Sequence, residues 1–274
     1  MYRIGISSCG FALTEENFQK LSAAGVAAIE LSMSLEKHKL IKHREVLAFS
    51  RCYQVELWSY HLPFMHFNAI DISSLHKELR DNAMRLYAEL IPKAADIGID
   101  KFVVHPSGEP IAAAEREERM KHAMQCLDEL AELAHRYGAV IAVEDLPRTC
   151  LGHTADEICR LISANDKLRV CFDTNHLLCD SNLRFMETLA DKIVTVHVSD
   201  YDFTDEKHWL LGEGLLDWGE MFAMLKQIGY CGVWMYELGL TPPKTLARSR
   251  DLTFEDFVLN AKTIFAGEPP KRID

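Results

Sequence analysis

Short runs of apolar residues recur along the chain, and each run stops at a polar residue or at a Gly/Pro break. Most of the runs are apolar almost throughout, which is typical of parallel strands that are buried on both faces. The pattern predicts eight strands, at Arg3–Ser7, Ala27–Leu31, Gln54–Ser59, Lys101–His105, Val140–Glu144, Leu168–Asp173, Ile193–His197 and Gly232–Glu237.

Between the predicted strands, apolar residues repeat at the spacing of one helix face, which predicts helices that pack on a sheet. The three clearest stripes are Leu127, Leu130, Ala131, Ala134 and Tyr137; Trp218, Met221, Phe222, Leu225 and Ile228; and Phe254, Phe257, Val258, Ala261 and Ile264. Thr154–Glu157 and Asp217–Glu220 resemble capping boxes that open two helices. A long helix over about 74–97 is expected to kink or break at Pro92, which lacks a backbone donor.

Strand–helix alternation along the whole chain predicts an α/β protein with a parallel sheet. Eight units in 274 residues suit a closed (β/α)8 TIM barrel, so we expect one domain over residues 1–274. A doubly wound open sheet is the alternative architecture. It is disfavoured because no GxGxxG segment follows the first predicted strand.

Composition and charge restrict the kinds of partner and cellular environment that fit the chain. The chain has 30 Lys and Arg against 41 Asp and Glu, and its net charge of −11 disfavours nucleic acid as the main partner. No uninterrupted apolar window is long enough to cross a membrane, and the opening residues do not resemble a secretory signal. Eight scattered cysteines without a CxxC pair then favour a reduced, cytoplasmic protein over a disulfide framework.

Titratable side chains gather where the predicted strands stop. The last four strands end in Glu144, Asp173, His197 and Glu237. Glu30, His61 and His105 lie at or just after the ends of earlier strands, and His176 lies three residues after Asp173. In a (β/α)8 barrel these ends meet at the C-terminal mouth, where such enzymes build their sites. Any one of these residues taken alone is more typical of a helix cap or an ion pair.

Three carboxylates and one imidazole would repel one another unless they took up protons or bound a cation. We therefore predict one divalent metal ion held by Glu144, Asp173, His197 and Glu237. Oxygen ligands with one nitrogen suit Mn²⁺, Zn²⁺, Mg²⁺ or Co²⁺. Four histidines are predicted to contact a polar substrate or further metals, namely His61, His105, His176 and His208.

Several segments together resemble the xylose-isomerase-like TIM-barrel superfamily, which includes sugar isomerases, ketose 3-epimerases, inosose dehydratases and endonuclease IV-type AP endonucleases. These segments are IAVEDLPRT (141–149), VCFDTNH (170–176), VHVSD (196–200), HWLLGEGLLDW (208–218) and MYELG (235–239), so the resemblance covers nearly the whole chain. It implies a TIM barrel with a metal site.

The resemblance to ketose 3-epimerases implies that Glu144, Asp173, His197 and Glu237 are metal ligands, with Glu144 and Glu237 also acting as the acid/base pair. It implies substrate contact by His176. Two positions depart from that pattern: Cys150 stands where those epimerases have a substrate-binding Glu, and His208 stands where they have an Arg.

Similarity to the AP endonucleases implies that the histidines at the barrel mouth bind further metal ions. His61, His105, His176 and His208 match metal ligands of those enzymes, and Glu206 replaces an additional Asp ligand. Nearly a full multi-zinc ligand set is therefore present.

These observations together predict a metal-dependent isomerase or epimerase of a small sugar or sugar phosphate in carbohydrate metabolism. Glu144 and Glu237 would move the proton through a metal-stabilised enediolate. Zinc-dependent AP endonuclease-like phosphodiesterase and inosose dehydratase-like lyase are the alternatives. Phosphate anchors, if any, would be Arg148, Lys207, Lys244 or Arg248, and residues 239–251 form either a lid or an ordinary loop. A homodimer is the base-rate expectation for the assembly.

Overall fold

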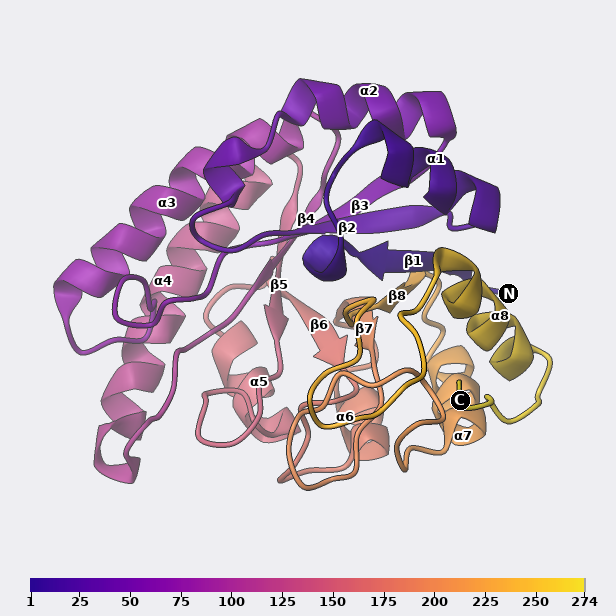
Figure 1. Cartoon of the computed structure of the whole chain (residues 1–274). Helices are drawn as coiled ribbons and strands as arrows, with labels where there is room; N and C mark the ends of the chain where they lie inside the picture. Colours follow the sequence, from indigo (N-terminus) through magenta and orange to yellow (C-terminus); the bar gives the residue numbers. More distant parts are fainter. Residues whose placement is uncertain (274) are drawn as a thin grey trace.

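Eight parallel strands close into one barrel in which each strand pairs with its neighbours in sequence order and β8 pairs with β1. The structure is a computed structural model, and it describes residues 1–273. Figure 1 shows the strands at the centre with the helices around them. The strands are β1 (Arg3–Ser7), β2 (Ala28–Ser32), β3 (Glu56–His61), β4 (Lys101–Val104), β5 (Val140–Glu144), β6 (Arg169–Asp173), β7 (Ile193–Val198) and β8 (Val233–Tyr236).

The helices follow the strands in strict alternation, which confirms the predicted (β/α)8 barrel. They are α1 (Glu15–Ala24), α2 (His43–Tyr53), α3 (Lys77–Ala95), α4 (Arg116–His135), α5 (Ala155–Ile162), α6 (Asn182–Thr188), α7 (Trp218–Gln227) and α8 (Phe254–Phe265). Three short 3-10 helices lie in the connections, at η1 (Ser8–Gly10), η2 (His38–Leu40) and η3 (Ala113–Glu115). In the part of the chain that is described, no helix is both long and apolar enough to cross a bilayer.

Three details differ from the sequence expectations. Helix α3 runs through Pro92 and ends three residues later, so the expected break is absent. Tyr137 lies beyond the end of α4 and is exposed, whereas the other residues of its stripe are buried. Thr154 and Asp217 cap α5 and α7, but the partner carboxylate of Thr154, Glu157, binds Arg116 and the Gly152 amide instead of closing a box.

Two irregularities in the sheet control which side chains face the barrel interior. The pairing of β2 with β3 shifts between Ile29 and Glu30, so that Trp58 becomes an extra residue in β3. A similar shift between Val170 and Cys171 inserts an extra residue into β7. A bulge of this kind re-aims the side chains that follow it. As a result, the ends of β3 and β7 present their polar residues inward.

The floor of the barrel is apolar and lies below the polar mouth. Ala28, Trp58, Val233 and Met235 form one small buried cluster, and a second cluster contains Val103, Ala142 and Cys171. The Trp58 indole donates to Thr195 Oγ1 at 3.1 Å, and Lys101 Nζ covers its ring at 3.8 Å from the centroid. Because strand side chains alternate, polar residues two positions further along these strands rise above the floor.

The connection between β7 and α7 is fixed by Asp200, whose buried carboxylate accepts hydrogen bonds from the Tyr201 and Gly212 amides and from the Trp218 indole. Gly214 passes so close to this network that a Cβ atom would lie 2.2 Å from Asp200 Oδ1 and 2.3 Å from the Tyr201 carbonyl oxygen. Only glycine fits there without displacement of the carboxylate.

Gly214→Ala is therefore expected to lower the free energy of unfolding by about 1–3 kcal/mol, because the new methyl group overpacks a site that cannot yield. Urea unfolding monitored by tryptophan fluorescence measures this loss. Gly219→Ala is the matched control, since its Cβ would meet only Asp217 Oδ1 at 3.2 Å, and equal stability losses in the two variants would contradict the prediction.

Candidate metal centre

Four consecutive strands carry the four predicted metal ligands to one place. Glu144 ends β5, Asp173 ends β6, His197 lies one residue before the end of β7, and Glu237 directly follows β8. Glu144, Asp173 and His197 are fully buried, and the Glu237 side chain is 12% exposed. One ligand atom from each residue lies within 4.8 Å of the ligand atoms of the other three.

His197 stands at the centre of this group. Its Nδ1 atom lies 2.9 Å from Glu144 Oε1, 3.0 Å from Glu237 Oε2 and 3.9 Å from Asp173 Oδ2. Strand register contributes directly, because Asp173 pairs with His197 across β6 and β7. The four residues are therefore neighbours in space although 93 positions separate Glu144 from Glu237 in the sequence.

The donor set fits a divalent cation. Asp173 Oδ1 accepts the Asn175 amide at 2.6 Å, but the buried Oδ2 atom has no hydrogen-bond partner. Burial raises the pKa of Asp173 to about 7, and the neighbouring carboxylates of Glu237 and Glu144 contribute to the shift. A cation among these oxygens would satisfy the unpartnered atom and remove the repulsion.

The imidazoles offset part of the acidic charge. Burial opposes ionisation of Glu144, but His197, His105 and His61 together hold its pKa well below the usual range. Burial also disfavours the protonated ring of His197, yet the surrounding acidic groups raise its pKa well above the ordinary value. Such strong mutual perturbation is typical of functional sites.

His61 and His105 form a second group on Glu144. His61 Nδ1 donates to the Leu62 carbonyl at 3.0 Å, which directs Nε2 toward Glu144 Oε2 at 3.1 Å. His105 Nε2 lies 3.0 Å from the same oxygen, and the Phe64 ring stacks on His105 with centroids 3.9 Å apart. Burial lowers the pKa of His105, whereas proximity to Glu144 outweighs burial at His61 and raises its pKa to about 9.

His176, Glu206 and His208 form a third group at the rim. His176 Nδ1 donates to the Asp145 carbonyl at 2.8 Å, and its Nε2 lies 3.4 Å from Glu206 Oε2. His208 Nδ1 donates to the Glu237 carbonyl at 3.0 Å. All eight residues predicted for the site thus meet at the mouth, and with Glu206 they form the three groups described, which are among the sets whose ligand atoms lie close enough to hold a metal ion.

Glu30 also belongs to this environment, although its role was not predicted. Its side chain is fully buried in the barrel interior, and its Oε2 atom lies 3.0 Å from His197 Nε2. The only sequence signal is its place near the end of a predicted strand. Its contact with His197 depends on the closure of the barrel, which brings β2 and β7 to face each other across the interior and which no local sequence pattern predicts.

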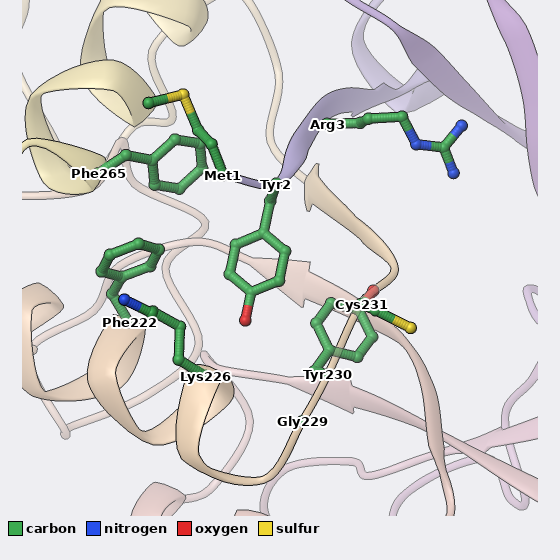
Figure 2. A pocket seen from close by; sticks show the side chains of 9 residues that line it. All are labelled: Met1, Tyr2, Arg3, Phe222, Lys226, Gly229, Tyr230, Cys231 and Phe265. Atoms are coloured by element: carbon green, nitrogen blue, oxygen red, sulfur yellow. The ribbon is translucent and has the colours of Figure 1, made fainter.

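Two cavities are prominent in the described residues, and neither is lined by any of the eight predicted site residues. The cavity of about 890 Å³ adjoins the site through Phe64, which stacks on His105 and lines this cavity together with Cys9 and Lys37. The other, of about 540 Å³, is lined by Tyr2, Phe222, Tyr230 and Phe265 near the start of β1 and the end of α8. Figure 2 shows these rings around the opening, and none of the eight predicted site residues lines it.

Comparison with solved structures gives the same fold. A D-tagatose 3-epimerase-like protein superposes with a TM-score of 0.79 at 23% sequence identity, covering 97% of this chain and 96% of its own. A D-psicose 3-epimerase crystallised in the presence of D-fructose superposes with a TM-score of 0.77 at 17% identity, covering 97% and 98% of the two chains. At these identities the likeness establishes the architecture alone.

Sequence comparison finds a relative in Methanocaldococcus jannaschii, the uncharacterized protein MJ1311. It is 30% identical over 190 residues, which are 66% of this chain and 64% of that protein, so the match spans a little under two thirds of the relative. The family model described as a xylose isomerase-like TIM barrel matches residues 18–253, which include all eight residues of the predicted site. The chain therefore belongs to the xylose isomerase-like TIM-barrel family.

Proposed function

We propose that this protein is a divalent-metal-dependent isomerase or epimerase of a small sugar that works by proton transfer between carbon and carboxylate. The observation that supports this most is the pair Glu144 and Glu237, whose carboxylates approach His197 Nδ1 from β5 and from the end of β8. Two carboxylates that flank a bound sugar could remove a proton from one carbon and return it to the opposite face of that carbon or to the neighbouring carbon.

Glu144, Asp173, His197 and Glu237 would hold the metal ion. When bound, a divalent ion polarises a carbonyl oxygen and thereby acidifies the adjacent C–H bond. The unpartnered Oδ2 atom of Asp173 supports this assignment, as does the meeting of three carboxylates in a group in which only Glu237 keeps some solvent exposure.

The chain's own groups carry the proton. One glutamate takes the proton from the carbon next to the carbonyl, and the electron pair of the broken C–H bond moves toward the carbonyl oxygen. The other glutamate delivers a proton to the opposite face in epimerisation, or to the neighbouring carbon in isomerisation. His61 and His105 contact Glu144 Oε2 and keep that carboxylate oriented, while His176 and His208 lie at the rim, where they can orient hydroxyl groups.

The charges around the mouth favour an uncharged sugar over a sugar phosphate. Arg148 is engaged by Glu109, by Asp205 at 2.7 Å and by Glu206 at 2.9 Å. Arg248 forms a buried pair with Glu213 at 2.6 Å. Two of the four predicted phosphate anchors are thus already neutralised, and the excess of carboxylates around Arg148 would repel a phosphate.

A second candidate function is metal-dependent phosphodiester hydrolysis. It is favoured by one observation, namely that His61–His105–Glu144 and His176–Glu206–His208 lie beside the main group and each offers three ligand atoms in one place. Inosose dehydratase-like lyase chemistry starts from the same proton abstraction as the isomerase and shares its ligand set. The net charge of −11 weighs against a polyanionic duplex as substrate.

Glu144→Gln and Glu237→Gln are each expected to slow solvent deuterium uptake by the sugar about 10²–10⁴-fold, because an amide cannot accept the proton. Mass spectrometry of ketoses and aldoses incubated in deuterated water with added Mn²⁺ measures the uptake. Asp205→Asn is the matched control, since this carboxylate contacts Arg148 outside the ligand groups. Full uptake by either glutamine variant would exclude the assigned pair.

Metal counting separates the two candidate functions. We expect the purified protein, stripped with chelator and reloaded, to bind one equivalent of Mn²⁺ or Zn²⁺ tightly, and to lose deuterium exchange when stripped. Plasma mass spectrometry gives the stoichiometry. Three equivalents of tightly held zinc would instead support the phosphodiesterase.

An uncharged ketose is expected to be turned over with a kcat/KM about tenfold or more above that of its phosphate ester, because the rim carboxylates disfavour the added charge. Steady-state kinetics on matched pairs, such as a pentulose and its 5-phosphate, provide the comparison. A preference for the ester would show that one of the two remaining predicted anchors, Lys207 or Lys244, is available to phosphate.

A further inference from the structure

We propose that Glu30 is the positioning residue that fixes the orientation of His197 and thereby sets the metal affinity of the centre. The inference rests on the proposed metal site and extends it to a residue outside the predicted ligands. His197 is the single nitrogen donor of the main group, so the direction of its ring decides where that donor points.

The contact between the two side chains is short and buried. Glu30 Oε2 lies 3.0 Å from His197 Nε2, and both side chains have no solvent exposure. A carboxylate oxygen facing a ring nitrogen at this distance accepts its N–H. With Nε2 used in this way, Nδ1 is the atom that faces Glu144 and Glu237.

Glu30 itself is held in place by two serines. Ser7, at the end of β1, donates to Oε1 at 3.1 Å, and Ser59 in β3 donates to Oε2 at 2.8 Å. The β3 bulge is what brings Ser59 into register with Glu30. Three adjacent strands therefore fix this carboxylate before any ligand is present.

The burial of Glu30 is difficult to explain as a stabilising device alone. A buried carboxylate costs more to desolvate than an apolar residue at the same position, and this cost is offset only by good partners. Its partners here are the hydroxyl groups of two serines and the Nε2 atom of His197. A carboxylate behind a ligating histidine fixes the ring, selects the proton-bearing nitrogen and raises the basicity of the other nitrogen.

The ring has no equivalent support without Glu30. The carboxylates of Glu144, Glu237 and Asp173 lie on the Nδ1 side, and the Cys171 thiol is a weak hydrogen-bonding neighbour of the ring. In the absence of Glu30, Nε2 would face a buried space between two serine hydroxyls, and the ring would be free to turn. The expected consequence is a weaker metal site in a protein that is still folded.

Isothermal titration of the chelator-stripped protein with Mn²⁺ tests this. Glu30→Ala is expected to weaken Mn²⁺ binding about 10–100-fold, which is typical for the loss of an outer-shell partner. Glu30→Gln keeps an oxygen that can accept the Nε2 proton but lacks the charge, so its affinity should fall between those of Glu30→Ala and the wild type.

Glu213→Gln is the matched control for a general loss of stability. Glu213 is likewise a buried carboxylate near the mouth, but its partners are Arg248 and the Leu210 amide. We expect this variant to lower the melting temperature while Mn²⁺ affinity of the folded protein stays at the wild-type value. Equal losses of affinity in Glu213→Gln and Glu30→Ala would overturn the proposal.

A spectroscopic readout separates this proposal from the proposed function. In metal-free protein labelled with ¹⁵N-histidine, the hydrogen bond to Glu30 predicts a slowly exchanging downfield proton on Nε2 of His197, and Glu30→Ala should abolish it. A wild type that shows this proton but binds no metal would refute the enzyme assignment and leave the orientation by Glu30 intact. An unchanged His197 signal in Glu30→Ala would refute the positioning role.

Discussion

Repulsion among carboxylates buried at one end of a barrel is the constraint around which this molecule is built. Glu144, Asp173 and Glu237 converge on His197 with almost no access to water, and Glu30 lies directly behind it. Such a group is costly to bury unless opposite charge compensates it. Three histidines supply part of that compensation within the protein, and the unpartnered oxygen of Asp173 shows that it is incomplete.

In the loops at the rim, buried or partly buried carboxylates are likewise compensated by opposite charge, here from arginines. Arg148 is shared among three carboxylates from two connections, and the buried pair of Arg248 with Glu213 ties the connection after β8 to the one after β7. A hydrogen bond from the Trp209 indole to Thr245 adds a second tie between the same segments. Residues 239–251 are thus fastened at two points, which is more typical of a fixed wall than of a lid.

Much of the architecture could be predicted because it depends on local patterns. Buried parallel strands are apolar throughout, and their ends are marked by the charged residues that a closed barrel collects at one mouth, so Glu144, Asp173, His197 and Glu237 could be chosen together. The ion pairs of Arg148 and Arg248 could not be predicted, because their partner carboxylates come from loops that are distant in sequence. The same holds for the hydrogen bond from Ser59 to Glu30, because the register shift that pairs these two residues carries no sequence signature. Tyr137 fitted the helix spacing but fell beyond the last turn, since periodicity does not mark where a helix ends.

Trp58 has a consequence for the path of protons. As the extra residue of β3, it lies across the floor of the barrel, bonded to Thr195 and covered from below by Lys101. The indole ring therefore fills the end of the barrel opposite the mouth, where only 9% of Trp58 is exposed. In the proposed reaction, a proton taken up by a buried glutamate would face the indole at this end and not bulk solvent, so that it would return to the substrate or leave through the mouth.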